Sequence, residues 1–290
     1  MKRPLLTATL LALTGAGAQA QGFNVAVSTS IIEDLVRNVA GKRVTITTLA
    51  PRDADTHDFQ PSTADSRSLA KARVVFLNGL GLEEWMSGTV RNAIPSGTPV
   101  VELASGIKPI KSDGEPDPHA WWDPHNAVQY VKAVADTLVK VDAGGAATYR
   151  TNAAAYTKAL NDLDAWAAKQ FATIPTARRK LVTNHDTFAY LARRYGLKVI
   201  GTVLPRGDSG REPSARELAA LSDTIKREGV KAIFVENTIA PRIAQTIASS
   251  TGARLAPPLY TDSLGKPGTA GDTYAKAFRH NVNTIVAALR

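Results

Sequence analysis

Residues 142–173 read DAGGAATYRTNAAAYTKALNDLDAWAAKQFAT, a segment without proline that divides the 290-residue chain almost evenly. Beyond the glycine pair, apolar and aromatic residues recur mostly at spacings of three and four: Tyr149, Ala153, Tyr156, Leu160, Leu163, Trp166 and Phe171. Such spacing is typical of one face of an α-helix. A run of about 28 residues at 1.5 Å each gives a helix of about 42 Å. We predict that this helix, within residues 144–174, links two halves of the chain.

Short apolar strands alternate with helical patterns on both sides of this segment. We predict strands at residues 23–28, 43–49, 74–77 and 99–103 before it, and at 180–183, 198–204, 231–235 and 256–260 after it. One helix should begin at Asp123, a helix-capping residue followed by Pro124 at the first helical position. The alternation predicts an α/β protein with mainly parallel sheets. We expect an N-terminal lobe (21–143) and a C-terminal lobe (175–290); the alternative is a single doubly wound sheet.

The N-terminus has the features of a secretory signal. Met1-Lys2-Arg3 is positively charged, residues 5–16 are apolar but too few to span a bilayer, and Ala18-Gln19-Ala20 offers a small-x-small cleavage site. We therefore predict a signal peptide over residues 1–20; the alternative is a buried N-terminal helix. The sequence contains no cysteine, so we expect a soluble periplasmic protein without a lipid anchor.

Composition excludes several classes of protein. Apolar residues make up 44% and charged residues 21%, as in ordinary globular proteins. The net charge of +9 is basic, but only 6% of residues are aromatic and no dense Lys/Arg stripe is interleaved with them, which argues against nucleic-acid binding. The lack of cysteine excludes disulfide scaffolds, thiolate metal sites and thiol nucleophiles.

Three of the five histidines fall where α/β folds gather their ligands, at strand ends and loop–helix junctions. These are His57, His119 and His185, and Asp262 follows the last predicted strand in the same manner. Three imidazoles and one carboxylate make a complete ligand set for a divalent ion. Their separations of 62, 66 and 77 residues match no local motif, so separate capping or surface roles are the alternative. We expect the other two histidines, His125 and His280, to be surface residues.

Six segments, taken together, resemble the TroA-like family of zinc/manganese solute-binding proteins of ABC importers. They are Thr56–Ser62, Leu77–Trp85, Asp117–Pro124, Asn184–Tyr190, and Phe234–Glu236 with Tyr260–Leu264. The resemblance covers essentially the whole chain after residue 20. It implies two lobes joined by one long helix, with the metal bound between them by His57, His119, His185 and Asp262. It also implies an importer permease and its ATPase as partners, and we expect a monomer.

The identity of the metal depends on two features. His185 occupies a position that is His in zinc-binding members of the family and Glu in many manganese-binding ones, and three nitrogen ligands favour Zn²⁺. However, the segment Lys111–Pro118 is short and has no histidine, unlike the His-rich loop of many dedicated zinc receptors. We therefore expect zinc and keep manganese as the alternative.

Four protein ligands would close the coordination shell, which suits carriage rather than catalysis. We name Asp58, Asp186 and Glu236 as candidate acceptors for the outer nitrogens of the ligand imidazoles. A secreted zinc hydrolase would need an open position on the metal, and no His-Glu-x-x-His is present. A receptor for an organic or oxyanion solute should show an anion-binding loop, for which Gly207–Arg211 is the nearest candidate. An added adhesin role stays open.

Overall fold

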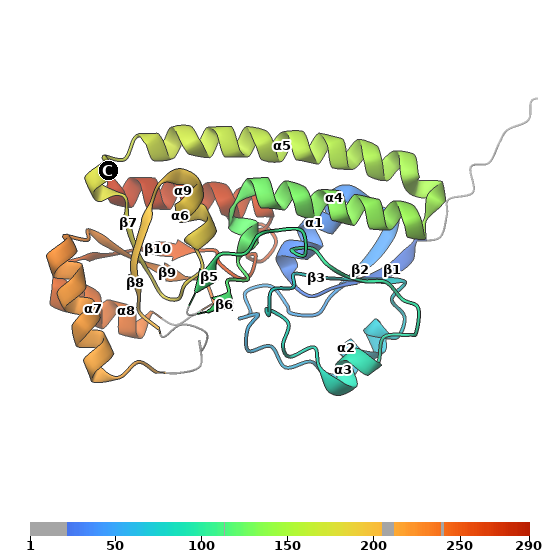
Figure 1. The fold of residues 1–290 in the computed structure, drawn as a ribbon, viewed down its shortest axis with the longest axis horizontal. Helices are drawn as coiled ribbons and strands as arrows, with labels where there is room; N and C mark the ends of the chain where they lie inside the picture. The colour runs from blue at the N-terminus through green and yellow to red at the C-terminus, as the bar shows by residue number, and fades with distance from the viewer. Residues whose placement is uncertain (1–21, 113, 205–211, 239–240) are drawn as a thin grey trace, which may run out of the picture.

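The chain forms two parallel β-sheets that lie side by side along one long helix, α5 (Ala146–Ala172). The computed structural model describes residues 22–112, 114–204, 212–238 and 241–290. Figure 1 shows α5 running across the backs of both halves. The predicted signal peptide (1–20) and the loop 207–211 lie outside the described residues. In the described ranges, no helix combines the length and apolar composition that crossing a bilayer requires.

The N-terminal sheet has the strand order β2-β1-β3-β4, with all neighbours parallel. Its strands are β1 (Phe23–Val27), β2 (Val44–Thr48), β3 (Val74–Leu77) and β4 (Val100–Glu102). The associated helices are α1 (Ser30–Ala40), α2 (Thr63–Leu69), α3 (Gly88–Asn92) and α4 (Pro124–Val141), with a 3₁₀ turn at Ala120–Trp122. A small antiparallel ribbon, β5 (Lys111–Ser112) with β6 (Glu115–Pro116), leads into the turn.

The C-terminal sheet has the strand order β10-β9-β7-β8, again parallel. Its strands are β7 (Lys180–Thr183), β8 (Lys198–Thr202), β9 (Ala232–Glu236) and β10 (Arg254–Leu259). Its helices are α6 (Ala189–Tyr195), α7 (Ala215–Glu228), α8 (Arg242–Thr251) and α9 (Tyr274–Leu289). Because the strands of each sheet are parallel, their carboxyl ends meet at one edge.

The two lobes share a continuous hydrophobic core with α5. Trp121 and Trp122 are both buried, and each indole N–H donates to the carbonyl of Thr261 in the other lobe, at 3.3 and 3.1 Å. The hydroxyl of Tyr274 donates back to the Trp121 carbonyl at 2.6 Å. Buried bonds of this kind are costly to break without replacement, so they fix one lobe against the other beside the strand ends.

The predicted fold class is confirmed: the protein is α/β, with two lobes and one long helix. The alternative of a single doubly wound sheet is wrong, because the eight main strands form two separate sheets. The long helix spans 27 residues, and α4 begins at Pro124 behind an Asp123 cap, as predicted. β10 begins two residues before the predicted strand, because the ladder already includes the charged Arg254, which apolar spacing left out. Its register shifts between Ala256 and Leu259, where two prolines interrupt the ladder.

Candidate metal-binding site

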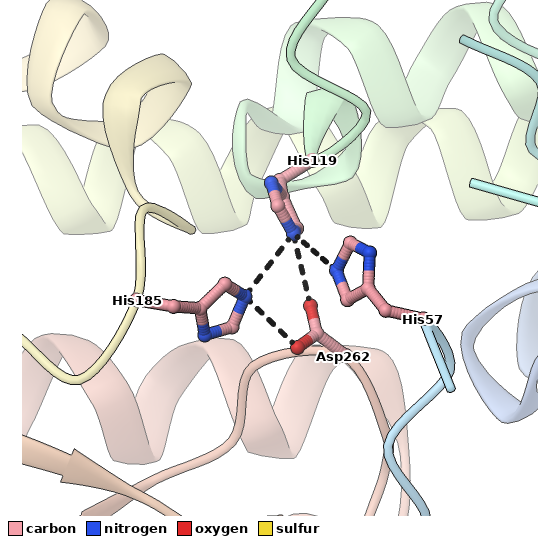
Figure 2. Close-up of side chains that lie close together, drawn as sticks. All are labelled: His57, His119, His185 and Asp262. Carbon is pink, nitrogen blue, oxygen red and sulfur yellow. Dashed lines mark hydrogen bonds and ion pairs between the residues drawn. The ribbon is translucent and has the colours of Figure 1, made fainter. Parts of the chain in front are cut away.

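The structure brings together the four residues that the sequence nominated. His57 lies in the loop after β2, His119 in the loop before the 3₁₀ turn, His185 just after β7, and Asp262 just after β10. Each offers one ligand atom, and these atoms all lie within 4.8 Å of one another. Figure 2 shows the three rings and the carboxylate converging from four separate segments. Each lobe therefore supplies two of the four side chains.

The spacing of the four side chains fits a single ion. The Nε2–Nε2 distances are 3.1 Å for His57–His119 and 3.3 Å for His119–His185. The carboxylate oxygens of Asp262 lie 3.2 and 3.1 Å from the Nε2 atoms of His119 and His185. Ligands held tetrahedrally at a Zn–N length of about 2.0–2.1 Å would be about 3.3 Å apart. The inner atoms thus lie at the separation that one small divalent ion requires.

Two of the three imidazoles have a carboxylate on the outer ring nitrogen. Nδ1 of His119 lies 2.7 Å from Asp117, and Nδ1 of His185 lies 2.7 Å from Glu236. In the neutral imidazole these partners hold the proton on Nδ1 and leave the Nε2 lone pair facing the centre of the site. Of the candidate acceptors named from the sequence, Glu236 has this position, Asp186 is buried beside His185, and Asp58 is exposed. Asp117 was missed.

Asp262 is the only carboxylate among the four. Its side chain is 1% exposed, and among the described residues its oxygens have no partner other than the Nε2 atoms of His119 and His185. A buried carboxylate needs such positive partners, because leaving its charge unpaired is costly. Both oxygens face the point on which the imidazoles converge. A cation at that point would satisfy them.

The charges of the site distinguish His57 from the other two histidines. Burial lowers the pKa of His57 to about 4, although the charge of Asp262 opposes the shift. Burial also acts to lower the pKa of His119, but Asp117 and Asp262 outweigh it and raise that pKa to about 9. Burial is likewise outweighed at His185, whose pKa Glu236 and Asp262 raise well above the usual value. At neutral pH without metal, His119 and His185 therefore hold a proton that an incoming cation must displace.

The same local turn positions the backbone of three histidines. In each, an aspartate two residues earlier accepts a hydrogen bond of 2.9 Å from the histidine backbone N–H: Asp55–His57, Asp117–His119 and Asp123–His125. Side chains of Asp favour such turns. At His119 alone of the three, the same carboxylate also reaches the ring. The Asp-x-His spacing is the sequence signal that could have identified Asp117.

The remaining two histidines lie outside the site. His125 is exposed in the first turn of α4. His280, on α9, is half-buried rather than fully at the surface, because its Nε2 bonds the carbonyl of Pro258 at 2.9 Å and its ring lies against Tyr260.

A family model described as zinc-uptake complex component A, periplasmic, matches residues 25–288. The chain belongs to this family. The resemblance to zinc/manganese solute-binding proteins that the sequence predicted is thereby confirmed. Members of the zinc-uptake component A family are metal-binding components of ABC importers rather than enzymes, and this chain is a substrate-binding protein of that kind.

Individual proteins similar to this member of the family are named for different metals. The manganese-binding lipoprotein MntA of Halalkalibacterium halodurans is 33% identical over 278 residues, which cover 95% of this chain and 91% of that protein. The periplasmic zinc-binding protein TroA of Treponema pallidum matches with a TM-score of 0.87 and 30% identity, over 92% of this chain and 99% of that one. A manganese-bound periplasmic protein of Candidatus Liberibacter asiaticus matches with a TM-score of 0.84 and 30% identity, over 92% and 100%.

Proposed function

We propose that His57, His119, His185 and Asp262 bind one divalent metal ion, Zn²⁺ in the first place, which the protein delivers to an ABC importer. One observation carries the proposal: the buried Asp262 carboxylate and three imidazoles converge on one point, and among the described residues its oxygens have no partner other than the Nε2 atoms of His119 and His185, at 3.2 and 3.1 Å. Without a metal, the protons on His119 and His185 supply the positive charge that faces Asp262. A bound ion would replace those protons and take the four side chains as its ligands.

The choice of zinc rests on the ligand set. Three imidazole nitrogens and one carboxylate oxygen suit a tetrahedral Zn²⁺, and zinc outcompetes manganese at most sites of nitrogen and oxygen ligands. Manganese is the second candidate, supported by the names of the manganese-binding relative and of the manganese-bound structure. If both oxygens of Asp262 bound the ion, the coordination number would rise to five, which would suit Mn²⁺ better.

The proposal is tested by native mass spectrometry of protein purified without chelators, with elemental analysis of the bound metal. We expect one zinc per chain in the wild type and none retained in Asp262→Ala, with His125→Ala as the matched control that keeps its metal. Manganese at one ion per chain would support the second candidate. A metal content that Asp262→Ala leaves unchanged would contradict the site.

The proposal also covers the cellular location of the protein and the division of its chain into working units. We infer export to the periplasm after cleavage at residue 20, and working units of 21–143, 144–174 and 175–290. The relatives named above include a lipoprotein, whereas these 290 residues contain no cysteine that could carry a lipid. An intact mass that begins at Gln21 would support both inferences, and an intact Met1 or an added lipid mass would overturn them.

A secreted zinc hydrolase stays the less supported alternative. Its metal would need a position open to water, but the four side chains already provide a full tetrahedral set. We also propose that the protein acts as a monomer. It would deliver the ion to the permease of the importer, which works with its ATPase.

A further inference from the structure

The charge of the protein is concentrated in one lobe. Residues 175–290 contain 18 Lys and Arg against 9 Asp and Glu, a net charge of +9. Residues 21–174 contain 15 Lys and Arg against 17 Asp and Glu, a net charge of −2. The metal site lies between the lobes, and none of its four residues is a Lys or Arg that contributes to this positive charge. A positive excess of this size, confined to half of a chain, creates a field that attracts anionic partners.

Within the C-terminal lobe, the cations gather where the strands begin. β7, β8 and β10 each start with a basic residue, and β9 starts directly after one. We name this surface the basic edge and define it as Arg178, Arg179, Lys180, Lys198, Lys231 and Arg254. Because His185 and Asp262 follow the carboxyl ends of strands in the same parallel sheet, the basic edge lies at the opposite end of the lobe from the metal.

Backbone hydrogen bonds and a shared hollow show that these residues are neighbours. The backbone N–H of Lys198 donates to the carbonyl of Arg179, and that of Arg254 donates to the carbonyl of Lys231. Arg178, Lys231 and Arg254 line one open hollow of about 380 Å³. The C-terminal end of α9 reaches the same outer end of the lobe (Figure 1).

The basic edge is left largely unneutralised. Among the described residues, only Lys180 has an ion-pair partner there, Glu228 at 3.0 Å. Lys198 and Lys231 are exposed, and their side chains have no hydrogen bond or ion pair within the described part of the chain. Both ammonium groups are therefore available to an anionic partner.

The shape of the basic edge fits a surface better than a single small anion. Neighbouring strands lie about 4.8 Å apart, so four strand starts spread the cations over a row rather than around one point. A row of this kind matches closely spaced phosphates, such as those of an anionic phospholipid bilayer. The protein serves an importer that lies in a membrane, and the sequence has no cysteine that could carry a lipid.

We propose that the basic edge of the C-terminal lobe docks on the anionic phospholipid surface of a membrane and holds the protein near its importer. Docking through the strand starts leaves the metal site, at the strand ends, accessible. The attraction depends on charge, so it weakens as salt shortens the range of the field.

The test is co-sedimentation of the purified protein with phosphatidylcholine vesicles that do or do not contain phosphatidylglycerol, at low and high salt. We expect binding only to the phosphatidylglycerol vesicles, with loss at high salt. Lys198→Glu with Lys231→Glu should weaken binding roughly tenfold or more. The matched control, Lys108→Glu with Arg150→Glu, makes the same charge change at exposed positions outside the basic edge and should weaken binding less than about threefold.

Several outcomes would overturn the proposal. Absence of binding to phosphatidylglycerol vesicles at low salt would exclude it, and equal weakening by both double variants would show that net charge alone matters. If inorganic phosphate, added at constant ionic strength, abolished vesicle binding, the basic edge would be a site for a single anion instead. Unchanged zinc affinity in both variants would show that they are folded, and it separates this test from that of the proposed function.

Discussion

The two lobes have the same strand order but use a glutamate near the third strand differently. In equivalent order, the sheets are β2-β1-β3-β4 and β8-β7-β9-β10. The half-buried Glu83 lies six residues after β3, and the buried Glu236 is the last residue of β9; each binds the loop that follows the first strand of its lobe. Glu83 accepts from the Ser28 hydroxyl at 2.6 Å, and Glu236 accepts from the His185 backbone N–H at 2.8 Å.

The difference lies in what the second carboxylate oxygen does. In the N-terminal lobe, Oε2 of Glu83 accepts from the backbone N–H of Gly79 at 3.0 Å, so this glutamate only fastens loops. In the C-terminal lobe, Oε2 of Glu236 faces the ring of His185 at 2.7 Å. A glutamate near the carboxyl end of the third strand is therefore structural in one lobe and a partner of a ligand imidazole in the other. With Asp262, it makes the C-terminal lobe the anionic half of the site.

The largest expected effect is the pH dependence of zinc affinity, to which His119 and His185 should contribute and His57 should not. Metal binding must displace a proton from His119, whose pKa is about 9, and from His185, whose pKa is also raised, whereas His57 is already neutral above its pKa of about 4. Apparent zinc affinity should therefore rise with pH by about two orders of magnitude per unit, or about four between pH 5.5 and 7.5. Calorimetry in buffers of different ionisation enthalpy measures the proton count.

The same titration on His57→Ala sharpens the contrast. Because His57 contributes no proton in this range, the variant should keep a slope of about two. A flat profile in the wild type would show that the histidines are not ligands, and a slope reduced to about one in His57→Ala would show that His57 does titrate there.

Removing single ligands should have the next largest effect, and an unequal one. Asp262→Ala leaves a cation among neutral imidazoles with no anionic ligand, so zinc affinity should fall by roughly two to three orders of magnitude. His119→Ala and His185→Ala remove buried donors and should cost a similar amount. His57 is only half-buried and has Asp55 two residues away, so His57→Ala should lose only about tenfold.

Competition with a chromogenic chelator ranks these four variants. A loss at His57→Ala that equals the loss at Asp262→Ala would remove the distinction between the ligands. No loss at His185→Ala would mean that the site is assigned wrongly.

The glutamate pair gives a smaller effect that tests the comparison of the lobes itself. Glu236→Gln removes the charge beside His185 and should weaken zinc binding about 10–100-fold. Glu83→Gln changes the equivalent residue of the other lobe and should leave zinc affinity within about twofold, because Glu83 contacts no ligand. Its effect should appear as a lower melting temperature of the metal-free protein. Equal losses of affinity in the two variants would contradict separate roles.

The smallest effect is expected at the two histidines outside the site. His125→Ala and His280→Ala should bind zinc within about twofold of the wild type, since distant and independent sites do not couple. His280→Ala should lower the melting temperature slightly by removing the bond to Pro258. A large loss of affinity at His125 would place a ligand where the structure has none.

Local rules predicted much of the fold but could not find the site unaided. The cap and proline at Asp123-Pro124 set the start of α4, and unbroken helical spacing set α5. Apolar spacing placed the start of β10 two residues too late, because the ladder begins at the charged Arg254. The site depends on contacts between residues at least 62 positions apart, which no local pattern encodes, so the resemblance to a family was needed to choose among the histidines.

The carboxylate partners of the imidazoles could not be identified from the sequence alone either. Asp117 is close to His119 in sequence, and its Asp-x-His spacing could have been recognised. The spacing alone is ambiguous, because Asp123 and His125 share it and lie outside the site. Glu236 acts on His185 from 51 residues away, through the pairing of β9 with β7. Only the assembled sheet shows which carboxylate reaches a ring.

The most direct measurement is a zinc-edge anomalous difference map from crystals of the zinc-loaded protein. We predict one strong peak per chain, bounded by the Nε2 atoms of His57, His119 and His185 and by the Asp262 carboxylate. A peak held by other residues, or no peak between the lobes, would contradict the proposed site.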